Sequence, residues 1–135
     1  MKDKKIIFVD DSPTMRRIIY NCLLKIGFKQ IVHAENGSDA ITKIKSDNFD
    51  LIITDWNMPD MNGIELVKQV RAMDRYRFIP ILMASTKTGK KDIKTAFESG
   101  VNDYLIKPFS GRNLKEKITE LLRGNEQTNF ISTDF

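Results

Sequence analysis

The sequence predicts an α/β fold in which a doubly wound, five-stranded parallel sheet is covered by five helices. Five short runs rich in β-branched and aromatic residues alternate strictly with five segments whose apolar residues recur at helical spacing. Each right-handed crossover between parallel strands lays its helix over the sheet, so strict alternation covers both faces. The chain has 135 residues, of which 41% are hydrophobic, and this suits one compact domain.

The expected strands are apolar throughout, which is typical of strands buried on both faces of a parallel sheet. They comprise residues 6–9, 31–34, 51–53, 79–84 and 104–106.

The first expected helix lies between the first two strands. Its apolar residues recur at helical spacing from Met15 to Ile26, and Gly27 follows as a C-cap. Pro13 suits the first turn, and either Asp11 or Ser12 can cap the N-terminus. The pattern predicts an amphipathic helix of about three to four turns.

The other four helices have similar start and stop signals. The second is entered through "ENGSDA", where Asn36 or Ser38 can cap the free amides. The third begins after Gly63, while Gly100 and Gly124 are expected to end the fourth and the fifth.

The segment after the fifth helix is polar, with a few apolar residues interspersed. We therefore expect a globular domain over residues 1–123 and a polar C-terminal tail over 124–135, "GNEQTNFISTDF". This tail is either unpacked or docked on the domain or on a partner.

Composition excludes several classes of protein. The balance of 22 basic and 18 acidic residues gives +4, and the basic residues are too scattered for nucleic acid to be the main ligand. The single cysteine, Cys22, cannot form an internal disulfide, and the single histidine, His33, has no companions for a zinc site. No run is long enough for a signal peptide or a membrane span. We expect a cytoplasmic, monomeric protein that does not contact a membrane.

Polar residues follow four of the five strands, at the edge where doubly wound sheets bind ligands. If the first and third strands are neighbours, three carboxylates, hydroxyls and an ammonium group converge there. These residues are Asp10, Asp11, Asp55, Ser85, Thr86 and Lys107. Each has an ordinary alternative, such as an N-cap for Asp11, a turn former for Asp55 or a solvated charge for Lys107, but their joint placement favours a phosphoryl-transfer site.

The adjacent pair Asp10 and Asp11 requires a compensating charge. Two carboxylates about 5 Å apart repel by roughly 3 kcal/mol at an effective dielectric near 20. Clustered carboxylates favour Mg²⁺, which neutralises such repulsion and lets an ionised aspartate attack phosphorus. A lysine and a hydroxyl aimed at the phosphoryl oxygens complete such a site.

The stretches "FVDDSPTMRR", "DWNMPDMNG", "ILMAST" and "NDYLIKPF" resemble the receiver domain of bacterial response regulators, most closely the single-domain chemotaxis regulators of the CheY type. The resemblance runs from about Lys4 to Arg123 and implies a flavodoxin-like sheet of order 2-1-3-4-5. It implies a regulatory phosphoacceptor, not an enzyme with a separate substrate.

The resemblance also assigns roles to residues of the site. Asp55 is implied to accept a phosphoryl group from a CheA-like sensor histidine kinase. Mg²⁺ is implied to bind the carboxylates of Asp11 and Asp55 and the carbonyl of Asn57, with Asp10 acting through water. The phosphoryl group is implied to contact Lys107, Ser85 and the amides of Trp56 and Thr86, and Pro108 is implied to follow a cis peptide.

Tyr104 is implied to report phosphorylation by turning inward and changing an effector-binding face. That face is basic with an apolar centre, and it comprises, beside Tyr104, Lys90, Ile93, Lys94, Ala96 and Lys117. It suits a short acidic and hydrophobic helix of the flagellar motor switch protein or another effector, and a phosphatase is a further expected partner. The alternatives are a phosphate sink, a relay or an interaction-only receiver that does not act on the motor.

Two enzyme classes fit poorly. A haloacid-dehalogenase-type phosphatase needs an aspartate two residues after its nucleophile, where this chain has Asn57. A nucleotide-binding protein would need the phosphate-binding loop pattern around "TKTGKKD". This stretch lacks both the glycine five residues before Gly89 and the Ser or Thr after Lys90.

Lys87 departs from the family pattern, since some chemotaxis members have an acid at this position. Its charge could attract anionic phosphodonors.

Overall fold

Five parallel strands form one sheet of order β2-β1-β3-β4-β5 in the computed structural model, which describes residues 2–134 and the side chains of 2–124. The strands are β1 (Lys5–Val9), β2 (Gln30–Ala34), β3 (Leu51–Thr54), β4 (Ile81–Ser85) and β5 (Asp103–Ile106). This order confirms the expected fold. The edge strand β2 is partly exposed, whereas β1, β3 and β4 are almost wholly buried.

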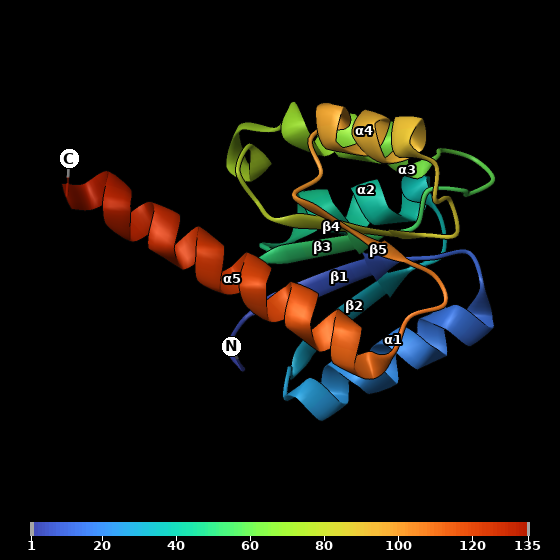
Figure 1. The fold of residues 1–135 in the computed structure, drawn as a ribbon, viewed down its shortest axis with the longest axis horizontal. Helices are drawn as coiled ribbons and strands as arrows, with labels where there is room; N and C mark the ends of the chain where they lie inside the picture. Colours follow the sequence, from blue (N-terminus) through green and yellow to red (C-terminus); the bar gives the residue numbers. More distant parts are fainter. Residues whose placement is uncertain (1, 135) are drawn as a thin grey trace.

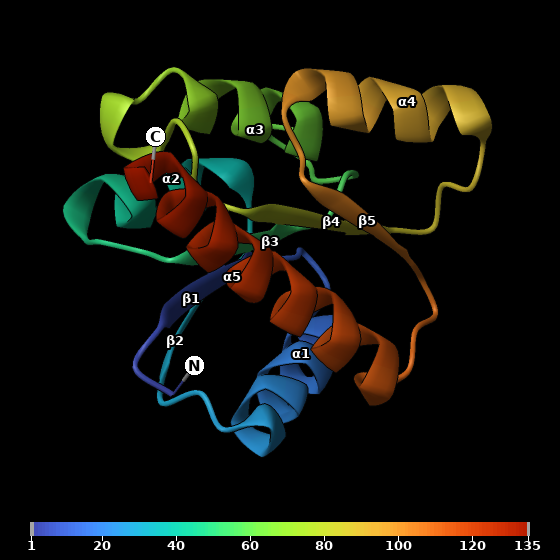
Figure 2. The same ribbon diagram turned by 60° about the vertical axis from the view of Figure 1, so that its left-hand side comes forward.

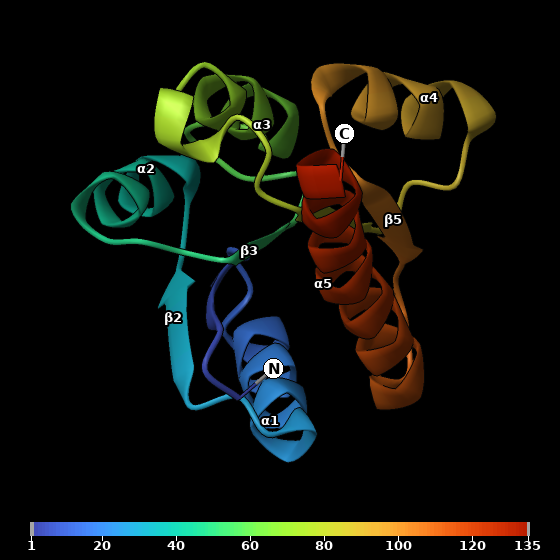
Figure 3. The same ribbon diagram turned by 90° about the vertical axis from the view of Figure 1, so that its left-hand side faces the viewer.

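Helices cover both faces of the sheet. They are α1 (Pro13–Ile26), α2 (Gly37–Ser46), α3 (Gly63–Arg71), α4 (Lys90–Ser99) and α5 (Gly111–Asp134), and a short 3-10 helix, η1 (Asp74–Tyr76), follows α3. Helices α1 and α5 lie on one face, and α2, α3 and α4 lie on the other (Figures 1 and 2). Figure 3, turned by 90° from Figure 1, shows the sheet between these two helical layers.

The alternation of side chains along each strand divides the core into two clusters. On β1, Ile6 and Phe8 pack toward α1 and α5, while Ile7 and Val9 pack toward α2, α3 and α4. All four side chains are at most 1% exposed. Apolar residues at successive positions are therefore required, because both faces of the strand are covered.

Pairing between β1 and β3 places the first and third strand ends side by side. Val9 is in register with Thr54, and the ladder extends one step further because the Asp55 amide donates to the Val9 carbonyl at 2.9 Å. The Asp10 amide likewise donates to Ala34 on β2 at 3.1 Å. Asp10 and Asp55 thus leave the sheet as neighbours.

Helix caps decide between the alternatives that the sequence leaves open. Ser12 caps α1, because its Oγ accepts from the Met15 amide at 3.2 Å, and Asn36 caps α2, because its Oδ1 accepts from the Asp39 amide at 2.8 Å. Gly27 and Gly100 end α1 and α4 with φ of 116° and 122°.

The end of α5 differs from the expectation. The helix passes through Gly124 and continues to Asp134, beyond the sheet (Figure 1). Among the glycines that the structure describes, positive φ occurs at Gly27 and Gly100 alone, so Gly124 is not used as a helix terminator. A helix-interior glycine costs only about 1 kcal/mol relative to alanine. Whether the apolar side chains of residues 125–135 dock lies outside the described side chains.

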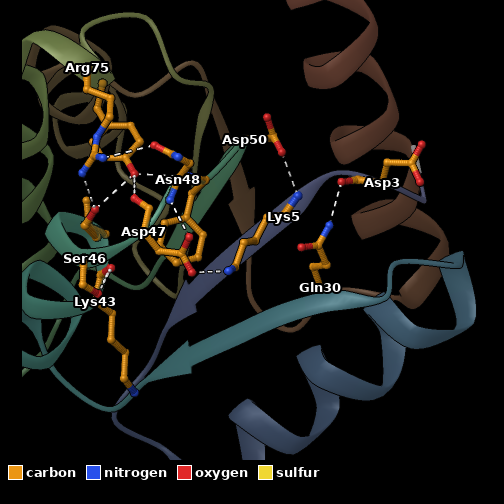
Figure 4. A network of polar contacts seen from close by, with 12 residues as sticks. Asp3, Lys5, Gln30, Lys43, Ser46, Asp47, Asn48, Asp50 and Arg75 are labelled. Atoms are coloured by element: carbon orange, nitrogen blue, oxygen red, sulfur yellow. Dashed lines mark hydrogen bonds and ion pairs between the residues drawn. The ribbon is translucent and has the colours of Figure 1, made fainter.

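A polar network joins the elements at the amino ends of β1 and β3 (Figure 4). The Lys5 ammonium pairs with Asp47, and the Lys5 amide donates to Asp50 at 2.8 Å. Arg75 donates to the Asn48 side chain at 3.1 Å and to the Lys45 carbonyl at 2.9 Å. These contacts tie η1 and the α2–β3 loop to β1 at the edge opposite Asp10 and Asp55. No helix in the described part of the chain has the length and apolarity needed to cross a membrane.

Candidate functional site

Three carboxylates meet at the carboxyl ends of β1 and β3, as the sequence predicts. Asp10, Asp11 and Asp55 each offer a carboxylate oxygen, and these atoms all lie within 4.8 Å of one another. Their exposure differs, because Asp10 is 1% exposed whereas Asp55 is half-buried and Asp11 is exposed. The cluster therefore has a buried side at Asp10 and an open side at Asp11.

Lys107 enters this cluster from the end of β5. Its Nζ lies 2.6 Å from Asp10 Oδ2 and 3.1 Å from Asp55 Oδ2. The Lys107 amide donates to the Ser85 carbonyl at 2.8 Å, which continues the β4–β5 ladder and fixes the direction of the side chain. The peptide bond between Lys107 and Pro108 is cis, as expected. A single ammonium group thus bridges the ends of β1 and β3.

The electrostatics of the site reflect burial and this bridge. Burial raises the pKa of Asp55, although the nearby Lys107 ammonium and its hydrogen bond oppose the rise. Burial alone would lower the pKa of Lys107, but its hydrogen bond to Asp10 and the charges of both aspartates leave that pKa above its ordinary value. At neutral pH Lys107 is accordingly a fixed cation between two carboxylates.

The backbone around Asp55 is held closely. The Trp56 amide donates to Asp55 Oδ1 at 2.7 Å, and the Gly63 amide donates to the Trp56 carbonyl at 2.7 Å. A Cβ on Gly63 would lie 2.1 Å from the Asp55 carbonyl oxygen, so only glycine allows the start of α3 to approach this closely. The bond from Gly63 to Trp56 therefore holds the two ends of the β3–α3 loop together.

The β4–α4 loop is fastened to the site through Lys87. Its amide donates to the buried Ser85 Oγ at 3.1 Å, and its carbonyl accepts from the Tyr104 hydroxyl at 2.8 Å. Its ammonium lies 5.1 Å from the centroid of the Trp56 ring. Tyr104 is 8% exposed and points inward, and burial raises the pKa of its hydroxyl. Thr86 is exposed at the start of this loop.

The donor set fits a hard divalent cation. Mg²⁺ binds carboxylate and carbonyl oxygens. The cluster offers three carboxylates, and the loop that follows Asp55 adds backbone carbonyls. Lys107 offsets the carboxylate charge on the buried side, while Asp11 leaves the other side open. The site is therefore suited to a cation that approaches from the side of Asp11.

The sequence model of the response regulator receiver domain matches residues 6–119, which is most of the chain. The chain belongs to this family. It is 47% identical over 123 residues to chemotaxis protein CheY1 of Helicobacter pylori, a match covering 90% of this chain and 99% of that protein. It is 48% identical over 119 residues to a chemotaxis protein CheY homolog of Campylobacter jejuni, covering 87% and 92% of the two chains.

Solved structures agree with this assignment. Chemotaxis response regulator CheY4 of Vibrio cholerae superposes with a TM-score of 0.84 at 35% identity, covering 88% of this chain and 98% of that one. A CheY-like receiver domain protein of Methanospirillum hungatei gives 0.85 at 26% identity, covering 93% and 98%. Receiver domains are the regulatory phosphoacceptors of two-component systems.

The expected effector-binding face of this receiver needs one correction. Ala96 is fully buried against the sheet and adds no surface, because it lies on the core side of α4. Lys90 and Lys94 are exposed as expected, Ile93 is half-buried, and Lys117 pairs with Asp103 at 3.1 Å. Helical spacing from Lys90 also brings in an exposed aromatic residue, Phe97, which is 43% exposed, and β5 adds Ile106 at 44%.

Some contacts of the receiver site carry no signal in the sequence. Arg16 on α1 donates to the Asp10 carbonyl at 2.7 Å and so braces the β1–α1 turn. Lys107 was expected to meet a phosphoryl group, and its double pairing with Asp10 and Asp55 was not anticipated. Asp60, in the β3–α3 loop, contacts α2 and was likewise not singled out. Each contact depends on the direction of a side chain, and those of Lys107 and Asp60 also join residues far apart in the sequence.

Proposed function

We propose that this receiver is a phosphoacceptor switch of a two-component chemotaxis system, in which Asp55 takes a phosphoryl group from a sensor histidine kinase with the aid of Mg²⁺. The observation that supports it most is the bridging of Asp10 and Asp55 by Lys107 beside the open carboxylate of Asp11. The chemotaxis assignment rests on the relatives at 47% and 48% identity, which are chemotaxis proteins.

The residues have distinct roles in the proposed transfer. A carboxylate oxygen of Asp55 forms a bond to phosphorus as the bond between phosphorus and the kinase imidazole breaks, and that imidazole takes a proton from solvent. Lys107 lies 3.1 Å from the Asp55 carboxylate and would stabilise the added phosphoryl charge. The Trp56 amide, already bonded to Asp55, and the Thr86 amide would donate to phosphoryl oxygens.

Mg²⁺ would be held by Asp11 and Asp55 and by the carbonyl of Asn57, and it would supply charge neutralisation at the phosphoryl group. Asp10 would act through water, because its Oδ1 already accepts from the Ser12 amide at 2.9 Å and its Oδ2 accepts from Lys107. Asp11 has the more exposed carboxylate and would meet the cation directly.

The proposed output passes through Ser85 and Tyr104. A phosphoryl group that attracts the Ser85 hydroxyl would disturb its bond from the Lys87 amide, and the Lys87 carbonyl is the acceptor for Tyr104. The change would reach the surface made by α4, β5 and α5. That surface combines the charges of Lys90 and Lys94 with exposed apolar groups, and so it suits an acidic, hydrophobic helix of the flagellar motor switch or another effector.

Phosphorylation can be tested by mass spectrometry with acetyl phosphate and Mg²⁺. The wild-type chain is expected to gain one phosphoryl group, and Asp55→Asn is expected to gain none. Asp74→Asn is the matched control, since Asp74 lies on η1, its side chain is 94% exposed and it pairs with Arg77. An unmodified wild-type chain under saturating donor and Mg²⁺ would overturn the proposal.

The partner can be tested separately by a pull-down of motor switch protein with and without beryllium fluoride, which imitates the phosphoryl group. A switch is expected to bind more tightly in the presence of beryllium fluoride. Equal binding in both states would point instead to a phosphate sink, a relay or an interaction-only receiver.

A further inference from the structure

The β3–α3 loop, residues 55–62, reaches across to another helix. The Asp60 carboxylate accepts from two successive backbone amides at the start of α2, with Gly37 N to Oδ1 at 3.2 Å and Ser38 N to Oδ2 at 3.1 Å. The loop that contains Asn57 is thus hydrogen-bonded to an element that contributes no residue to the phosphoacceptor site.

These bonds complete a helix N-terminus that its own cap leaves unfinished. Asn36 Oδ1 accepts from the Asp39 amide at 2.8 Å, and the Asn36 carbonyl accepts from the Ala40 amide at 3.0 Å. The first two amides of α2, those of Gly37 and Ser38, donate instead to the two carboxylate oxygens of Asp60. A carboxylate suits this place because it offers two acceptors and because the positive end of the helix dipole favours a negative charge.

A close packing contact supports the same connection. A Cβ on Gly37 would lie 2.5 Å from Met61 Cβ and 3.0 Å from the Met61 carbonyl oxygen. Gly37 is therefore in direct contact with the residue next to Asp60, and no larger residue fits without movement of the loop. At its other end the loop is closed by the bond from Gly63 to Trp56.

The loop is consequently held at two points. Its base is fixed by the bond from the Gly63 amide to the Trp56 carbonyl, and a second point is fixed at Asp60, so Asn57 lies between the attached residues Trp56 and Asp60. Hydrogen bonding by the Ser38 side chain and by the Ser38 and Gly37 amides lowers the pKa of Asp60, whose carboxylate is charged at neutral pH.

We propose that Asp60 is a positioning residue for the cation site, because its bonds to the α2 N-terminus hold the β3–α3 loop where the Asn57 carbonyl can act as a ligand. This inference rests on the proposed function and adds to it a contact to α2. A metal site whose ligands are held in place beforehand binds its ion more tightly than one whose loop must first be ordered.

The test is a Mg²⁺ titration of the full chain followed by the fluorescence of Trp56, the single tryptophan, which adjoins Asp55. Asp60→Ala is expected to weaken Mg²⁺ binding about tenfold, as changes to residues that support metal ligands commonly do. Asp60→Glu retains the charge but alters the reach, so it is also expected to weaken binding by about threefold or more. Circular dichroism checks that both variants are folded.

Two controls separate positioning from other causes. Asn36→Ala removes the local cap of the same helix but leaves the Asp60 contacts, and its Mg²⁺ affinity is expected to stay within about twofold of wild type. Repeating the titrations in 1 M KCl, where the screening length falls to about 3 Å, removes the distant effect of one negative charge. The difference between Asp60→Ala and wild type is expected to persist there.

Phosphorylation kinetics supply an independent measure. If Asp60 positions the ion, the labelling rate of Asp60→Ala with acetyl phosphate falls at low Mg²⁺ and returns to the wild-type value at saturating Mg²⁺. Wild-type affinity in Asp60→Ala, an equal loss in Asn36→Ala, or a loss that disappears in 1 M KCl would each overturn the positioning role. If wild type itself shows no response to Mg²⁺, the proposed function fails and the positioning role fails with it.

Discussion

Replacing Lys107 with methionine tests the electrostatic account of the site. The change removes the cation that lies 2.6 Å from Asp10 and 3.1 Å from Asp55, and it retains a long apolar side chain. Asp10 and Asp55 then face each other with side chains only 2% and 13% exposed. Two charges at 4.8 Å, the upper limit of the separations within the cluster, repel by about 3.5 kcal/mol at an effective dielectric of about 20.

The expected result is a loss of about 3 kcal/mol in the free energy of unfolding at pH 7.5 without Mg²⁺, in line with removal of one partner from a buried ion pair. Lowering the pH should reduce the loss. Without Lys107, burial and Asp10 raise the pKa of Asp55 further, so the folded state binds more protons than the unfolded state and its stability rises as the pH falls. Saturating Mg²⁺ should also reduce the loss, since it returns positive charge to the cluster.

Urea unfolding followed by circular dichroism at pH 7.5 and 5.5, with and without Mg²⁺, measures these changes. The control is Lys117→Met, which breaks the more exposed pair with Asp103 at 3.1 Å and should change stability by less than about 1 kcal/mol. If Lys107→Met matches wild type at pH 7.5 without Mg²⁺, or if its deficit is the same at both pH values, the reasoning is refuted.

Four further substitutions test packing and hydrogen bonds in the site and in the rest of the fold. Gly63→Ala should lower the free energy of unfolding by about 2 to 3 kcal/mol, because its Cβ would overlap the Asp55 carbonyl. Gly124→Ala should raise the free energy of unfolding by about 1 kcal/mol, because a Cβ at this helical position meets open space. Urea titrations measure both changes. Tyr104→Phe removes one hydroxyl bond to the β4–α4 loop, so hydrogen exchange of that loop should quicken while stability falls by about 1 kcal/mol. Arg71→Ala should lower the midpoint of thermal unfolding by several degrees, because it removes bonds to the η1 and α4–β5 loops, and calorimetry would contradict this by showing an unchanged midpoint.

The fold and the site were predicted from the sequence to different depths. The alternation of apolar runs and helical patterns is a local signal, and the rule that ligands bind at the carboxyl ends of parallel strands then brings Asp10, Asp55 and Lys107 together without any knowledge of side chains. The resemblance supplied the strand order, which the structure confirms.

The features that the sequence did not predict depend on backbone conformation and on the directions in which side chains point. The resemblance placed Ala96 on the effector-binding face, although its side chain is buried against the sheet. Gly124 resembles a helix terminator, but a glycine marks a helix end only where its φ is positive. Asp60 meets α2 across 22 to 23 residues of sequence, and no spacing rule relates a loop to the start of another helix.

The direction of α5 has a practical consequence for experiments. Lys2 leads into the amino end of β1, and α5 runs opposite to the strands, so the described chain begins and ends on the side of the sheet away from Asp55 (Figure 1). A fluorescent protein, an affinity tag or a surface linker joined at either end would therefore leave the mouth of the carboxylate cluster open to a kinase or a small donor. Immobilised or labelled forms of the chain should exchange phosphoryl groups as freely as the untagged form.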